Sequence, residues 1–143
     1  MELNPDFPIV SGAFAMPNNW TLTLPVECNR RVEDGSLVLW THDLTLWINI
    51  WQNDANLSMQ EQAERILAQA SAARREQNIE RSDTLLRLTY ELAEQDSEQP
   101  TTEQRAISGH VISPAGYVQI AAYFDTPEAR TVGYQVIGSV RQK

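Results

Sequence analysis

Apolar and polar side chains alternate along much of the chain, with the two-residue period of half-buried β-strands. The alternation is clear from Trp20 to Leu24, and Pro25 is expected to end that strand or to place it at a sheet edge. The same pattern predicts further strands at Gly12–Met16, Ser36–Thr41, Leu44–Trp51, Thr84–Leu92, Arg105–Ile112 and Tyr117–Phe124. The short polar links after Thr41 and after Ile112 predict two hairpins.

Two segments have the period of a helix instead. Ser58 and Glu61 have the spacing of a capping box, so a helix is expected to begin there and to fade around Arg75–Asn78. A second helix is expected after Asp125 or Thr126, with Pro127 in its first turn. The glycines of this second helix lower its intrinsic helicity, so tertiary packing must stabilise it. Such glycines can also allow a close approach between the helix backbone and a neighbouring element.

This order of elements predicts an α+β domain. We expect an antiparallel sheet of about six strands, with the two helices packed on one face. The strongly aliphatic face of the strands should meet these helices, and it comprises Leu44, Leu46, Ile48, Ile50, Val118, Ile120, Ala122 and Phe124. The chain is expected to be one domain over 1–143, with an N-terminal arm at 1–11 and an acidic mobile loop at 93–104.

The opposite face of the same strands is aromatic and polar together. Its side chains could pack under a loop or the N-terminal arm, form the seam of a dimer, or line a groove for a partner. If this face binds a partner, we predict that the contacting residues are Trp47, Asn49, Trp51, Gln119 and Tyr123.

Charge and cysteine content narrow the function classes. Eleven Lys and Arg residues against 19 Asp and Glu residues give a net charge of −8, which argues against nucleic acid as a partner. No apolar run is long enough for direct membrane insertion, and the N-terminus lacks the pattern of a secretory signal. With Cys28 as the single cysteine, we expect a cytoplasmic protein.

Candidate catalytic groups are few. Cys28 with His42 or His110 would be a nucleophile and a base, but their spacing gives no support, so a buried or inert thiol and two ordinary histidines are expected. His110 in particular is expected to be solvated or hydrogen-bonded. The sequence predicts no catalytic residues, no metal site and no cofactor.

The element order, Met16-Pro17-Asn18-Asn19-Trp20 and the last helix, ending Val136–Arg141, resemble the PsbP-like fold. That fold is shared by photosystem II extrinsic subunits, a Ran-binding nuclear import factor, the DcrB lipoproteins and the Eag chaperones of type VI secretion. Without a signal or a lipidation cysteine, the chain is most similar to the Eag type. This resemblance implies a homodimer that shields apolar helices of a secreted effector in a sheet-lined groove. The family's N-terminal motif has no residue-by-residue match here, so no binding residue is carried over.

The first functional hypothesis is therefore a non-enzymatic protein-binding module, such as a cytoplasmic adaptor or effector chaperone. A second is an enzyme or small-molecule binder with a pocket under the loop at 94–104. A third is an acidic immunity protein that neutralises a basic toxin, since the net charge suits such a target.

Overall fold

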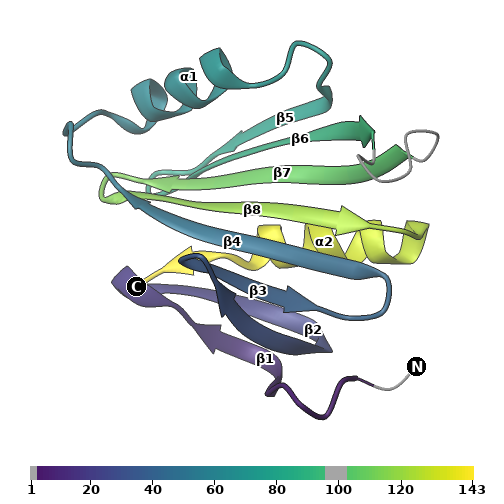
Figure 1. Ribbon diagram of the computed structural model, residues 1–143. Coiled ribbons are helices and arrows are strands. Elements are labelled where there is room, and N and C mark those ends of the chain that lie inside the picture. Colours follow the sequence, from purple (N-terminus) through teal and green to yellow (C-terminus); the bar gives the residue numbers. More distant parts are fainter. Residues whose placement is uncertain (1–2, 96–102) are drawn as a thin grey trace.

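An antiparallel sheet builds most of the molecule (Figure 1). The computed structural model describes residues 3–95 and 103–143. Its strands are β1 (Ile9–Ala15), β2 (Trp20–Glu33), β3 (Ser36–Trp40), β4 (Leu44–Gln52), β5 (Arg75–Arg81), β6 (Leu86–Gln95), β7 (Glu103–Ser113), β8 (Gly116–Phe124) and β9 (Arg141–Gln142). The helices are a 3-10 turn at Pro17–Asn19, α1 (Met59–Gln69) and α2 (Pro127–Ser139). The strand order is β1-β2-β3-β4-β8-β7-β6-β5, and β9 pairs with β2.

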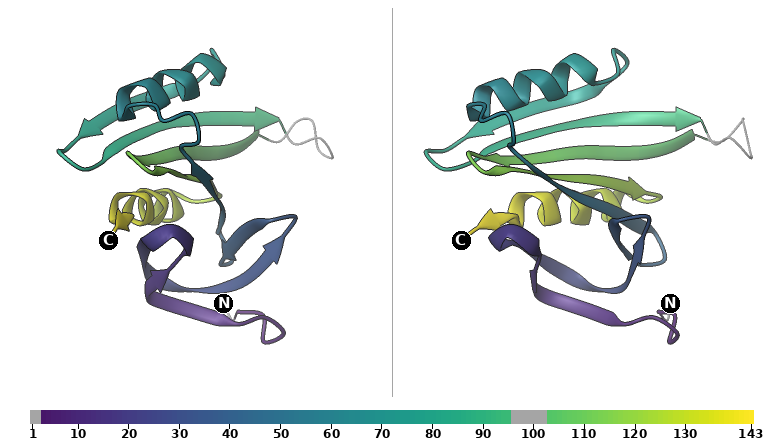
Figure 2. Two further views of the ribbon diagram at one scale, coloured as in Figure 1. Left: turned by 90° about the vertical axis from the view of Figure 1, so that its left-hand side faces the viewer. Right: turned by 60° about the vertical axis from the view of Figure 1, so that its left-hand side comes forward.

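The expected fold class is wrong in two respects. Within the described residues the sheet has nine strands instead of about six, and strands make up 54% of the structure. The two α-helices also lie on opposite faces: α2 lies in the curve of the sheet and α1 on the other side (Figure 2). Both faces need cover because β7 is apolar on both, with Ile107 and Val111 toward α2 and Ile112 toward α1.

The largest departures from the predicted strands are at β2, β5 and β9. β5 forms where the first helix was expected to fade, and the short β9 follows α2. β2 continues through Pro25 to Glu33. Pro25 is tolerated because it lies between Leu24 and Cys28, where the register with β1 shifts and neither β3 nor β9 pairs with β2.

Several local predictions are confirmed. The β3–β4 and β7–β8 pairs are antiparallel hairpins. The α1 capping box has both of its hydrogen bonds: Glu61 N donates to Ser58 Oγ at 3.1 Å, and Ser58 N donates to Glu61 Oε1 at 3.0 Å. Thr126 caps α2, accepting a hydrogen bond from Ala129 N at 3.0 Å.

The main core lies between α2 and the aliphatic face of the sheet. A Cβ added at Gly109 of β7 would lie 2.8 Å from Ile137 Cδ1, and one added at Gly133 of α2 would lie 3.0 Å from Ile107 Cδ1. These two glycines therefore let the helix and the strand approach closely. Gly138 has no such neighbour within 4 Å, so the close approach expected of the α2 glycines is found at Gly133 alone.

The expected arm and loop are partly replaced by strands. β1 begins at Ile9, so the segment before the first strand is shorter than the predicted arm. β6 reaches Gln95 and β7 begins at Glu103, while 96–102, the centre of the predicted acidic loop, lies outside the described residues.

Candidate functional site

The five residues predicted for partner binding all lie on one face of β4 and β8. In the register of these strands, Trp47 pairs with Ala121, Asn49 with Gln119, and Trp51 with Tyr117. Directly paired residues of antiparallel strands point to the same side of a sheet. We call this surface the aromatic face, formed by Trp47, Asn49, Trp51, Tyr117, Gln119 and Tyr123.

Trp51 is the most exposed aromatic residue of this face. Its side chain is 51% exposed, and its ring centre lies 6.5 Å from that of Tyr117. The indole Nε1 donates a hydrogen bond of 3.3 Å to Gln119 Oε1. Asn49 Oδ1 accepts one of 2.8 Å from Ser36 Oγ of β3. Neighbouring strands thus hold Trp51 and Asn49 in fixed orientations.

The tryptophans of the β3–β4 hairpin have different surroundings. Trp40 packs edge-on against Phe7 of the segment before β1, with ring centres 5.0 Å apart. The Arg31 guanidinium lies 4.7 Å from the Trp40 ring centre and 5.9 Å from that of Trp47. These are cation–π distances, and they place a positive charge beside the aromatic face.

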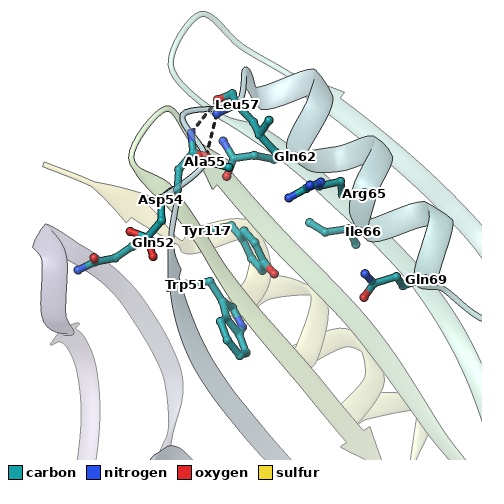
Figure 3. Close-up of a pocket in the computed structure, with 11 residues that line it drawn as sticks. Trp51, Gln52, Asp54, Ala55, Leu57, Gln62, Arg65, Ile66, Gln69 and Tyr117 are labelled. Atoms are coloured by element: carbon teal, nitrogen blue, oxygen red, sulfur yellow. Dashed lines mark hydrogen bonds between the residues drawn. The ribbon is translucent and has the colours of Figure 1, made fainter.

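A groove separates the aromatic face from α1 (Figure 3). Part of it is a hollow of about 310 Å³, with Trp51 and Tyr117 on the sheet side and Arg65, Ile66 and Gln69 on the helix side. Two amide side chains fix the position of α1. Gln62 Nε2 donates to Ser113 O at 3.0 Å, and Asn53 Nδ2 donates to both Leu57 O, at 2.7 Å, and Pro114 O, at 2.9 Å.

The groove continues into a second hollow of about 400 Å³, beside β6 and β7. Trp51, Tyr117 and Ile66 line both hollows, and the second is also lined by Tyr90 and His110. The His110 ring lies between two phenol rings, with centre-to-centre distances of 6.1 Å to Tyr90 and 5.9 Å to Tyr117. Aromatic surface therefore extends from Trp51 to His110.

His110 is neither solvated nor fully hydrogen-bonded, so the sequence-based expectation for this residue is wrong. It is 4% exposed, and its Nδ1 is a buried atom without a hydrogen-bond partner. Burial lowers the pKa of His110 to about 4, which makes the imidazole neutral at pH 7. An unpaired buried polar atom costs about 1–3 kcal/mol, so this one invites an explanation.

Sequence reasoning did not identify Tyr90, His110, Ile66 and Gln69 as neighbours in one groove. One signal was present: Leu86, Leu88 and Ile112 form an apolar patch that needs a cover, and α1 supplies it through Ala63. Strand order was the missing information, because β4, which carries Trp51, comes to lie beside β8 only through long-range pairing.

The remaining candidate groups lie elsewhere. Cys28 is in the main core, so the expectation of a buried thiol is confirmed, and burial raises the pKa of that thiol to about 11. Within 3–95 and 103–143, no cluster of three His, Cys, Asp or Glu side chains is arranged to hold a metal ion. None of the helices in these ranges combines the length and the apolar character of a membrane span.

Comparison with known proteins identifies the fold alone. No protein-family model and no curated protein matches the chain. The fold is similar to a crystal structure from Bacteroides thetaiotaomicron VPI-5482, with a TM-score of 0.56 and 12% sequence identity. The match covers 93% of this chain and 48% of that one, so this chain spans about half of its neighbour's length. This neighbour does not bear on the PsbP-like resemblance, which stays a prediction.

Proposed function

We propose that the protein is a non-enzymatic binding module that holds a protein partner on its aromatic face. The observation that carries this proposal is the 51% exposure of Trp51 on β4, a strand with neighbours on both sides. Exposed tryptophans that stand on rigid elements are common anchors of protein interfaces, because an indole offers large contact area at little conformational cost.

The surroundings of Trp51 favour binding over mere surface packing. Trp47 lies four residues before Trp51 on the same face, with the Arg31 guanidinium 5.9 Å from its ring centre. Aromatic residues and arginine are enriched at interface centres. The opposite face of β4 is buried against α2 through Leu44, Leu46 and Ile48, so the support beneath the aromatic face is well packed.

Photo-cross-linking tests this proposal on the full chain. A benzophenone amino acid replaces Trp51 in one variant and Val32 in a matched control. Val32 is 66% exposed and shares the face of Ile48, opposite to the aromatic face. In the native organism we expect a discrete adduct from position 51 and none from position 32. Adding Trp47→Ala should reduce the yield at position 51 at least about tenfold, the scale of an interface hot spot.

Three outcomes would contradict the proposal. Equal adducts from both positions would show that contact with the partner is not specific to the aromatic face. No adduct from position 51 would leave that face without a partner. An adduct of twice the chain mass, containing only this chain, would assign the face to a dimer seam. The finer expectations of an effector chaperone and of a cytoplasmic location stay predictions, which the identity of the adduct and cell fractionation would test.

A further inference from the structure

The hollow beside His110 has the shape and lining of a small-ligand site. Its volume of about 400 Å³ is within the range of such sites. Trp51 and Tyr117 supply aromatic walls from the sheet, and Ile66 closes the helix side. Ligand sites combine such apolar walls with a few polar groups that orient the ligand.

Three polar side chains supply that orienting chemistry. Gln69 and Gln119 each line the hollow with an amide that can donate and accept hydrogen bonds. His110 lines it with an imidazole that is only 4% exposed, and its Nδ1, itself a buried atom, has no partner. Such an atom calls for an explanation, and a hydrogen-bonding ligand beside the ring is one.

The charge of the lining defines the ligand further. None of the described residues that line this hollow is Asp, Glu, Lys or Arg. Two charged residues, Arg65 and Asp54, line the neighbouring hollow instead. Burying an ion without a counter-charge is costly, so an uncharged ligand suits this site.

We propose that the hollow between α1 and the sheet binds a small, neutral, planar molecule that stacks on Trp51 and Tyr117 and hydrogen-bonds to His110. This inference does not rest on the protein-binding proposal. Trp51 borders both surfaces, but the ligand site uses the α1 side of its indole and the partner surface uses its exposed part beside Trp47. Either proposal can fail while the other stands.

The test uses two probes that share one ring system. 2-Naphthol is neutral at pH 7 and can both donate and accept a hydrogen bond, so it suits either tautomer of His110, whereas 2-naphthoate carries a charge. Two-bond ¹H–¹⁵N spectra of the full chain report on its two histidines, and exposed His42 serves as the internal reference. We expect 2-naphthol to shift the His110 ring nitrogens saturably while His42 stays fixed, and 2-naphthoate to bind at least about tenfold more weakly.

Two variants complete the design. Trp51→Ala removes a half-exposed side chain without opening the core, and it should weaken 2-naphthol binding at least about fivefold. Val32→Ala, on the opposite face, should leave the affinity unchanged. The proposal is overturned if His110 does not shift at saturating 2-naphthol, if 2-naphthoate binds as tightly, or if Trp51→Ala binds like the wild type. A His110 shift seen only with a cross-linked protein partner would also overturn it, by assigning the hollow to the partner surface.

Discussion

Glu91 of β6 shows how single side chains hold α2 on the sheet. Its carboxylate is 4% exposed and accepts hydrogen bonds from Tyr134 Oη at 2.5 Å and from Arg130 Nε at 3.1 Å. Arg105 Nη2 lies 3.8 Å from Glu91 Oε1. Burial raises the pKa of Glu91, but the hydrogen bonds and the two guanidinium charges outweigh it, so the pKa is below the ordinary 4.5. Burial of the phenol and its hydrogen bond to this carboxylate raise the pKa of Tyr134.

This network predicts a pH dependence of stability. The pKa of Glu91 is lower in the folded than in the unfolded chain. The ionised carboxylate therefore stabilises the fold fully above pH 4.5, and this stabilisation is lost as the pH falls through the pKa that Glu91 has in the folded chain. Glu91→Gln should lower the free energy of unfolding at pH 7 by about 2 kcal/mol, since hydrogen bonds to a charged acceptor are lost. Urea unfolding at pH 7 and at pH 3.5 should show this difference shrinking in acid.

Glu33→Gln is the matched control for this prediction. Glu33 pairs with Arg31 at 2.9 Å on the exposed surface, where such pairs contribute less than about 1 kcal/mol. A Glu91→Gln variant as stable as Glu33→Gln at pH 7 would show that the buried network contributes little.

At the scale of elements, α1 is the part of the groove that depends most on local chemistry. A helix of 11 residues is marginal by itself, so α1 relies on its capping box, on Gln62 and on the packing of Ala63. Ser58→Ala should cost about 1 kcal/mol and speed hydrogen exchange of the α1 amides. Thr126→Ala, at the cap of α2, should act instead on the α2 amides. Unchanged exchange in α1 after Ser58→Ala would show that packing alone fixes this helix.

The β2–β3 hairpin and β5 differ in how far the sequence could predict them. The β2–β3 connection is a two-residue turn, Asp34-Gly35, with positive φ at both positions. Asp-Gly between apolar runs is a strong hairpin signal, so this hairpin could have been predicted. β5 could not, because every one of its residues is exposed and it carries no apolar alternation. Only hydrogen bonding to β6 makes it a strand.

For the whole molecule, the net charge of −8 separates two kinds of partner. Binding through the uncharged side chains of the aromatic face should hold nearly constant with salt, whereas an acidic immunity protein would lose affinity for a basic toxin. Once the cross-linked partner is identified, its Kd should change less than about twofold between 50 and 300 mM NaCl. Trp47→Ala should raise the Kd about tenfold at both salt concentrations. A Kd that rises more than about tenfold with salt would favour the immunity hypothesis.

The sequence by itself determined the features that depend on neighbours along the chain. The β3–β4 and β7–β8 hairpins, the caps at Ser58 and Thr126, and the shared face of Trp47, Asn49 and Trp51 all follow from turn chemistry, capping and a period of two. These signals are local, so they needed no knowledge of strand order.

Only the tertiary structure decided how these pieces meet. It extended β2 past Pro25, added β5, and placed the two helices on opposite faces. It also brought His110 of β7 under α1, beside Trp51, with a nitrogen left unpaired. The positions of the helices and of His110 depend on residues far apart in the sequence, because long-range pairing such as that of β4 with β8 sets which faces are buried. β5 and the end of β2 depend on hydrogen bonds to neighbouring strands, which local periodicity does not encode.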